Sequence, residues 1–135
     1  MLSIPGYKIT RKLYESASTV IYRAALKENR QSFTLKILKK ENPSQTDIDE
    51  FLSQFDIIKD VSINGIARIY QVENFNGRFA LVIEDFNAIS LKEYLKETLE
   101  LKKFLNIAIK LSETIGDLHK NNIIHKNLSM DKIPI

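Results

Sequence analysis

The segment "IIHKNLSMDKI", residues 123–133, gathers the side chains that are most able to do chemistry. It places one histidine, two lysines, one asparagine and one aspartate after two isoleucines. Such a group can be a catalytic loop, the remains of one, or a charged tail. An asparagine amide cannot act as a general base at neutral pH, so Asn127 cannot be the base of a catalytic loop.

The second candidate is Lys36, in the stretch "FTLK" at residues 33–36. Side chains two residues apart share one face of a strand, so Lys36 is expected to lie beside Thr34 and Leu38. The alternating residues on the other face are apolar. Taken alone, a strand lysine is most simply a solvated side chain, so the wider pattern decides its role.

Metal chemistry is not indicated. Neither His119 nor His125 has a histidine, cysteine or carboxylate partner at the spacing of a metal site. The chain contains no cysteine, so it has no disulfide framework and no thiolate ligands, which suits a reducing compartment.

The first two thirds of the chain are expected to form a five-stranded antiparallel sheet and one helix. β-Branched and aromatic runs predict strands at residues 7–14, 19–26, 32–39, 66–75 and 78–85. Asn76-Gly77 predicts a tight hairpin between the last two strands, since both residues tolerate a positive φ. The helix follows Pro43 and ends before Gly65, with Thr46 and Asp49 as a capping box.

The remainder is expected to be helical. Ser90 and Glu93 match a capping box that opens a short helix. A longer helix over residues 104–118 carries a wide apolar stripe, which needs a surface to pack against. The stripe consists of Phe104, Ile107, Ala108, Leu111, Ile115 and Leu118.

Length and composition indicate a single cytoplasmic domain. The chain has 135 residues, of which 44% are hydrophobic, and a net charge of +3 from interspersed charges. No basic block suggests a nucleic-acid partner, and no apolar run approaches the ~20 residues that span a membrane. The N-terminus also lacks the features of a signal peptide.

The order of these elements, with the stretches "LVIEDFNAISLKEYL" and "IAIKLSETIGDLHKNNIIHKNL", resembles the eukaryotic-type protein kinase domain of bacterial serine/threonine kinases. The resemblance extends from Tyr7 to Ile133. It implies an α+β fold in which residues 1–135 form part of a kinase domain. The implied parts are an N-lobe at 7–84, a hinge at 85–90, and the start of a C-lobe at 91–135, ending after the catalytic loop and before any metal-binding DFG-like motif.

The resemblance also implies a site for ATP. Lys36 matches the lysine that holds the phosphates, and the backbone of Glu84 and Phe86 matches the hinge groups that contact adenine. The side chains of Glu84 and Asp85 would be incidental there. The implied cofactor-binding positions are Lys36, Ser16, Thr19, Ile21, Thr34, Glu84 and Phe86.

Several positions depart from the kinase pattern. Tyr14, Ser16 and Thr19 replace the phosphate-loop glycines, which disfavours close approach of phosphates. Gln54 replaces the glutamate that pairs with the strand lysine. Asn127 stands at the catalytic aspartate position and Lys132 where a metal-binding asparagine is expected, so magnesium binding is not supported.

Three functions remain open. The first is a serine/threonine kinase of a signal-transduction protein, inactive as an isolated chain. The second is a pseudokinase-type module that contacts a protein partner through the apolar face of helix 104–118, or that forms oligomers. The third is a truncated relic of a larger kinase.

Overall fold

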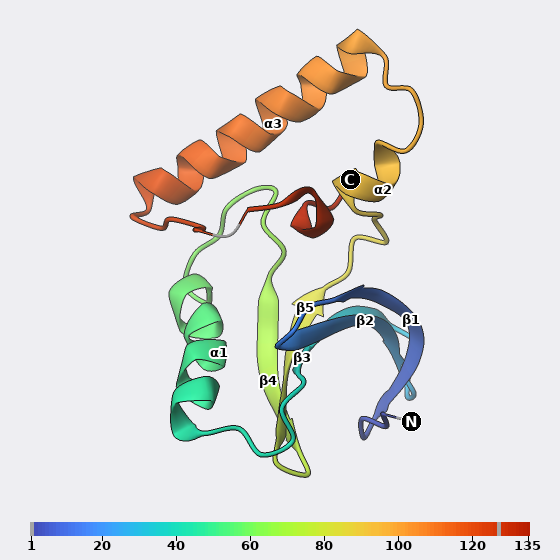
Figure 1. Ribbon diagram of the computed structural model, residues 1–135, viewed down its shortest axis with the longest axis vertical. Coiled ribbons are helices and arrows are strands. Elements are labelled where there is room, and N and C mark those ends of the chain that lie inside the picture. Colours follow the sequence, from blue (N-terminus) through green and yellow to red (C-terminus); the bar gives the residue numbers. More distant parts are fainter. Residues whose placement is uncertain (1, 127) are drawn as a thin grey trace. The chain divides into compact units, whose positions relative to one another are not determined.

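The computed structural model describes residues 2–126 and 128–135 (Figure 1). The chain divides into two compact units. The first, called here the sheet unit, comprises Met1–Asp60 and Ala67–Asp85. The second, called the helical unit, comprises Val61–Ile66 and Phe86–Ile135. Each unit carries its own set of functional candidates and is described separately.

The sheet unit contains a five-stranded sheet in which every neighbouring pair is antiparallel, as the sequence predicts. The spatial order is β1-β2-β3-β5-β4. Asn76 and Gly77 form the β4–β5 turn with φ values of 52° and 75°, which confirms the predicted hairpin. The strands are β1 (Tyr7–Glu15), β2 (Thr19–Leu26), β3 (Ser32–Leu38), β4 (Ile69–Phe75) and β5 (Arg78–Glu84).

Helix α1 (Gln45–Ile58) follows β3. Its N-cap is Ser44, whose side chain accepts a hydrogen bond from the Asp47 amide while the Asp47 carboxylate accepts one from the Ser44 amide. The predicted Thr46–Asp49 box is therefore wrong by two residues. The reason is that Ser44 can adopt the extended conformation an N-cap needs (φ −69°, ψ 164°) directly after Pro43.

Apolar side chains cover both faces of the sheet. On one face Leu35 and Ile37 of β3 join Val20, Ala24 and Val82 in a cluster that also takes in the N-terminal Ile4. On the other, Leu38 and Leu81 pack with Phe51 of α1. Because alternate residues of β3 point to opposite faces, Lys36 projects on the side that α1 covers.

The helical unit contains α2 (Leu91–Tyr94), α3 (Leu101–Lys120) and the short 3-10 helix η1 (Met130–Lys132). Ser90 caps α2 as predicted, accepting a hydrogen bond from the Glu93 amide at 3.2 Å. The chain end returns to this point, where Ile89 and Ile135 exchange backbone hydrogen bonds of 2.9 and 3.3 Å.

Helix α3 begins at Leu101, earlier than the predicted 104. Of the predicted stripe, Leu118 is buried and Phe104 is exposed, while the other members are half-buried. Segment 61–66 lies against this helix, since Thr114 Oγ1 donates to the Asn64 carbonyl at 3.3 Å. Among the described residues no helix is long and apolar enough to span a membrane.

Candidate functional site

Lys36 is half-buried in the middle of β3, on the sheet face that α1 covers. Its cross-strand neighbours are Ile21 of β2 and Leu81 of β5, and cross-strand neighbours point to the same face of a sheet. The ammonium group donates a hydrogen bond to Gln54 Oε1 of α1. The lysine is thus positioned by apolar side chains along its stem and by an amide at its tip.

Gln54 reaches Lys36 because α1 is fixed to the sheet one turn earlier. Phe51, three residues before Gln54, is only 3% exposed and packs against Leu38 and Leu81. The prediction that Gln54 occupies the position facing Lys36 is confirmed. A glutamine oxygen accepts the hydrogen bond but carries no net charge, so this contact orients the ammonium group without neutralising it.

The loop between β1 and β2 contains two of the predicted phosphate-site residues, Ser16 and Thr19. Here the loop is closed by its own hydrogen bonds. The Ser16 amide donates to the Thr19 carbonyl at 2.8 Å, and the Thr19 amide donates to Ser16 Oγ at 3.1 Å. The two hydroxyls are also within 3.1 Å of each other. A phosphate cradle needs amides that point at the ligand, and the amides of Ser16 and Thr19 are already used within the loop.

Lys39, which the sequence analysis did not single out, holds this loop from outside. Its ammonium group donates to the Ser16 carbonyl at 3.1 Å and pairs with Glu15 at 2.8 Å. Hydrogen bonds and charges from Lys12 and Lys39 lower the pKa of Glu15 to about 2. The only sequence signal was the position of Lys39 directly after the end of β3.

The expected adenine-side residues lie on the same face of the sheet as Lys36. Thr34 is half-buried and pairs with Arg23 of β2 and Ile83 of β5. Ile21 is also half-buried, next to Lys36. Ile21, Leu81 and Ile83 form an apolar wall around Lys36 and Thr34 on this face, and the charged Arg23 lies at its edge, opposite Thr34.

At the end of β5 the backbone is fixed on both sides. The Glu84 amide donates to the Arg68 carbonyl at 2.8 Å, and Glu84 Oε2 accepts from the Arg68 amide at 3.1 Å. The next residue, Asp85, accepts hydrogen bonds from Arg23 Nε at 2.9 Å and from Ser32 Oγ. The sequence analysis missed this cluster, because pairing between residues 23 and 85 depends on the strand order.

The remaining predicted residues belong to the helical unit. Phe86 is 49% exposed. Asn127, the predicted catalytic position, lies outside the described residues. Lys132 ends η1, where the kinase pattern expects a metal-binding asparagine. Within residues 2–126 and 128–135 no group of three histidine, cysteine or acidic side chains is placed to hold a metal ion.

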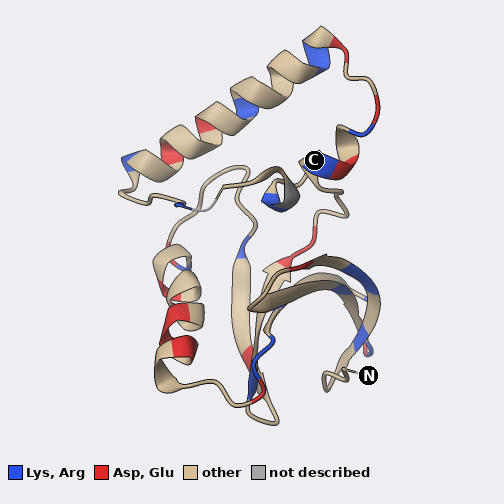
Figure 2. Ribbon diagram, viewed as in Figure 1, with Lys and Arg blue, Asp and Glu red and all other residues tan. Residues whose placement is uncertain are grey.

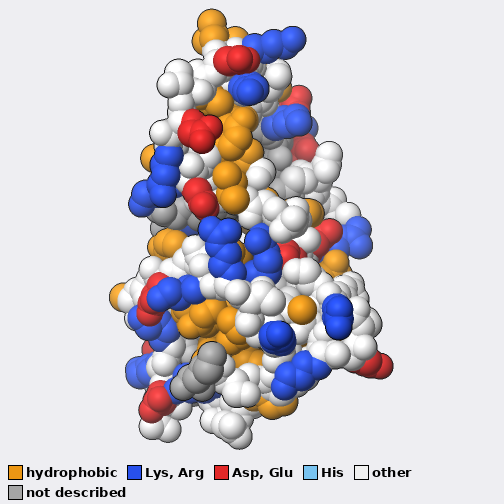
Figure 3. Space-filling model, turned by 90° about the vertical axis from the view of Figure 1, so that its right-hand side faces the viewer, with side chains coloured by type: hydrophobic (Ala, Val, Ile, Leu, Met, Phe, Trp, Pro, Cys, Tyr) orange, Lys and Arg blue, Asp and Glu red, His pale blue; other side chains and the backbone are white. Residues whose placement is uncertain are grey.

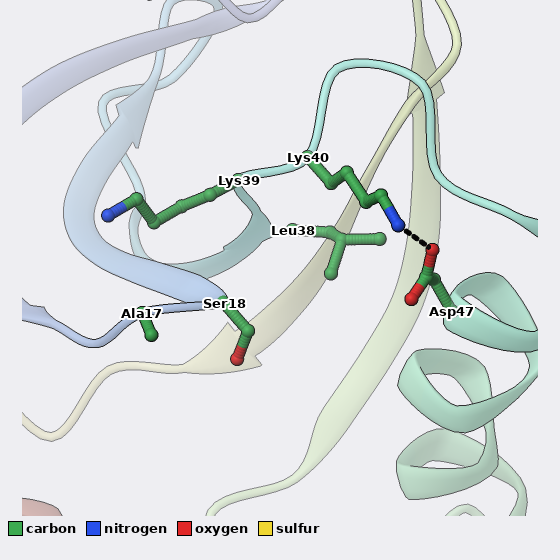
Figure 4. A pocket seen from close by; sticks show the side chains of 6 residues that line it. All are labelled: Ala17, Ser18, Leu38, Lys39, Lys40 and Asp47. Atoms are coloured by element: carbon green, nitrogen blue, oxygen red, sulfur yellow. Dashed lines mark hydrogen bonds and ion pairs between the residues drawn. The ribbon is translucent and has the colours of Figure 1, made fainter.

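A hollow of about 400 Å³ lies beside the loop between β1 and β2, away from Lys36 (Figure 4). Lys40 and Asp47 form an ion pair of 2.6 Å on one side of it. The hydrogen bond from Lys40 is the main cause that lowers the pKa of Asp47 to about 2, with Ser44 contributing. The hollow is lined by Ala17, Ser18, Leu38, Lys39, Lys40 and Asp47, and Lys36 is not among them.

Comparison with known proteins agrees with the arrangement of Lys36, α1 and the sheet. Residues 7–134 match the family described as protein tyrosine and serine/threonine kinase. A probable serine/threonine-protein kinase of Clostridium acetobutylicum is 24% identical over 135 residues, which cover 96% of this chain and 20% of that protein. A serine/threonine-protein kinase of Arabidopsis thaliana is 26% identical over 101 residues, covering 73% and 18% of the two chains. The chain thus spans about a fifth of the length of these relatives, and it belongs to the protein tyrosine and serine/threonine kinase family.

Proposed function

We propose that this chain is a kinase-like nucleotide-binding module that does not transfer phosphate by itself. The observation that supports nucleotide binding is the placement of Lys36, whose ammonium group is held by Gln54 at the end of an apolar wall. In this proposal the side chains of Ile21 and Thr34 contact the adenine. The backbone of Glu84 and Phe86 supplies its polar partners, and Lys36 contacts the phosphates.

The same site argues against phosphoryl transfer. That reaction depends on positioning and on neutralising the charge of the transferred group. The amides of Ser16 and Thr19 are used within their loop, and Gln54 brings no charge. The sequence places Asn127 at the position of the catalytic base, where an amide cannot accept the substrate proton. ATP supplies a transferable phosphoryl group in active relatives of this fold, and none of these residues promotes its departure.

A thermal-shift titration with ATP, with and without magnesium, tests nucleotide binding. A ligand that binds only the folded state stabilises it by RT ln(1 + [L]/Kd), so a ~100-fold excess over Kd contributes ~2.7 kcal/mol. We expect ATP to raise the melting temperature of the wild-type chain with little dependence on magnesium. The shift should be lost in Lys36→Ala and kept in Lys8→Ala, which removes an exposed lysine from β1.

Gln54→Glu sharpens the test. A carboxylate at this position gives Lys36 the charged partner found in active kinases, and we expect ATP affinity to rise severalfold because charge-assisted hydrogen bonds are stronger. Phosphate release from ATP with magnesium should stay at background for both proteins. A cooperative melting transition that does not move at millimolar ATP would contradict nucleotide binding, and steady phosphate release by the wild type would contradict the catalytic part.

A further inference from the structure

The polar cluster at the end of β5 lies on the same sheet face as the proposed adenine contacts. Arg23 of β2 is the cross-strand partner of Thr34, so both side chains point to this face. Asp85 accepts hydrogen bonds from Arg23 Nε at 2.9 Å and from the Ser32 hydroxyl. These three residues, Arg23, Ser32 and Asp85, are called here the hinge clamp.

The hinge clamp contains an ion pair that is largely withdrawn from water. The side chains of Asp85 and Arg23 are 3% and 15% exposed. Other basic residues of these strands are solvated, since Lys8, Arg11 and Arg30 are exposed, and Figure 3 shows Lys and Arg side chains spread over the surface on the side where β1 lies. An ion pair removed from water loses in desolvation much of what it gains in attraction, so apolar residues would stabilise the sheet about as well. The pair is therefore better explained by the position that it gives to Asp85.

Holding Asp85 also holds the peptide that joins it to Glu84. This peptide is planar and carries the Glu84 carbonyl, so the direction of the carbonyl is set by the backbone at the two ends of the peptide. At the Glu84 end, the amide of that residue donates to the Arg68 carbonyl at 2.8 Å. At the other end, the Asp85 side chain is held by Arg23 and Ser32. The Glu84 carbonyl is therefore fixed before a ligand arrives.

The Arg68 amide does not bond the Glu84 carbonyl, although the two residues are neighbours. In a regular antiparallel ladder, a residue that donates to its neighbour's carbonyl also accepts from that neighbour's amide. Here the Arg68 amide donates to Glu84 Oε2 at 3.1 Å, so the carboxylate takes the place of the carbonyl. Figure 2 shows the ribbon red where β5 ends, and both carboxylates there, those of Glu84 and Asp85, have partners within the sheet unit. What this segment can offer to a ligand is the Glu84 carbonyl, which is an acceptor.

We propose that the hinge clamp positions the Glu84 carbonyl and thereby selects a purine that carries a 6-amino group. An amino group donates to the fixed carbonyl, whereas a purine without it leaves the carbonyl unpaired. A carbonyl that is held in advance adds no ordering cost on binding. This inference rests on the proposed nucleotide site. It makes Arg23, Ser32 and Asp85 positioning residues, which act on the base through the backbone.

Titration of the wild-type chain with adenosine and with purine riboside, followed by NMR spectroscopy, tests the selection. Purine riboside lacks only the 6-amino group. We expect adenosine to bind about tenfold more tightly, because purine riboside leaves the Glu84 carbonyl unpaired. The Asp85 amide belongs to the same peptide as this carbonyl, so its signal should shift with adenosine and stay in place with tripolyphosphate.

Two variants loosen the hinge clamp in different ways. Ser32→Ala removes one donor to Asp85, and the double variant Arg23→Met with Asp85→Leu replaces the ion pair by apolar side chains, which usually keeps a fold stable. Both should stay folded by circular dichroism, while the preference for adenosine over purine riboside falls to about threefold or less. Arg30→Met is the matched control, because it removes an exposed arginine from the turn between β2 and β3 and should keep the wild-type preference.

Tripolyphosphate, which has phosphates but no base, separates this inference from the proposed function. It should bind the wild type and the clamp variants equally, and it should fail to bind Lys36→Ala. If the wild type bound neither adenosine nor tripolyphosphate, the proposed function and this inference would both be wrong. Three results would overturn the inference alone: equal binding of adenosine and purine riboside by the wild type, an unchanged preference in both clamp variants, or loss of tripolyphosphate together with adenosine in those variants.

Discussion

The two units of this chain bury their apolar residues very differently. Among the described residues, every buried side chain except Leu91 and Leu118 lies in the sheet unit. The helical unit instead carries most of the large hydrophobic side chains that remain exposed, including Leu101, Phe104 and Ile109. The sheet and α1 therefore supply each other with a core, whereas the described helices of the other unit leave much of their apolar surface exposed.

The comparison also separates the functional candidates. Lys36 and its apolar wall belong to the unit with the closed core, where packing on both sheet faces fixes each side chain. The altered catalytic segment around His125 and Lys132 belongs to the other unit. The proposed function draws on both units, the nucleotide-binding proposal on Lys36 and the proposed loss of phosphoryl transfer on the segment around His125.

Leucine truncations in the two units provide the largest test of this difference. Leu35 is fully buried in the sheet core, so Leu35→Ala should lower the free energy of unfolding by about 3–4 kcal/mol through lost contacts and a residual cavity. Leu105→Ala, on exposed α3, should change it by less than about 0.5 kcal/mol under conditions where the chain is monomeric. Urea unfolding measures both. Equal losses would mean that α3 is packed in solution.

The second test concerns the ion pair at the end of the sheet. The side chains of Asp85 and Arg23 are only 3% and 15% exposed. Asp85→Asn removes the carboxylate charge that pairs with the Arg23 guanidinium, so the free energy of unfolding should fall by about 2 kcal/mol, somewhat below the 3–5 kcal/mol of a fully buried pair. Asp56→Asn removes an exposed partner of Lys59 and should produce no measurable change in the same urea titration.

Glycine substitutions test how firmly segment 61–66 is held in the helical unit. Gly65 and Gly77 both have a positive φ, so alanine at either position costs about 1–2 kcal/mol of backbone strain. Only at Gly65 does the new Cβ also meet a neighbour, Thr114. We therefore expect Gly65→Ala to destabilise the chain more than Gly77→Ala. If the two losses were equal, the contact between segment 61–66 and α3 would be loose.

The sheet could be predicted well from the sequence, because the features that indicate strands and turns lie close together along the chain. Alternation, turn residues and the Asn76-Gly77 hairpin indicate all five strands, and together with the kinase resemblance they place Gln54 opposite Lys36. Other features depend on contacts between distant residues. The pairing of Arg23 with Asp85 follows from the strand order, and the closed loop at Ser16 and Thr19 follows from hydroxyl geometry. Neither leaves a periodic signal in the sequence.

The capping error has a similar origin. Thr46–Asp49 and Ser44–Asp47 have the same spacing, and both place a hydroxyl before an acidic residue. The choice between them depends on where the chain leaves its extended conformation after Pro43, and in the structure Ser44 still has that conformation (φ −69°, ψ 164°). Composition alone does not contain that information.

Low pH should lower the stability of the sheet unit through protonation of Glu15 and Asp47. This is the smallest of the expected effects. The pKa of Glu15 is lowered from 4.5 to about 2, first by Lys12 and then by Lys39, and the pKa of Asp47 is lowered from 3.8 to about 2, first by Lys40 and then by Ser44. A depressed folded-state pKa stabilises the fold above the unfolded-state pKa, and this stabilisation is lost as the pH falls from about 4.5 towards 2.

Because all of these groups are in contact with water, the contribution should be small and should shrink further in high salt. Thermal melts between pH 6 and about 2 should show a decline below about pH 4.5 that becomes shallower in Glu15→Gln. The same substitution in high salt should make little difference, since the ions already screen Lys12 and Lys39 from Glu15. If the loss of thermal stability at low pH were unchanged in Glu15→Gln, the acid sensitivity would arise elsewhere. The contacts of Glu15 with Lys12 and Lys39 would then not stabilise the sheet unit.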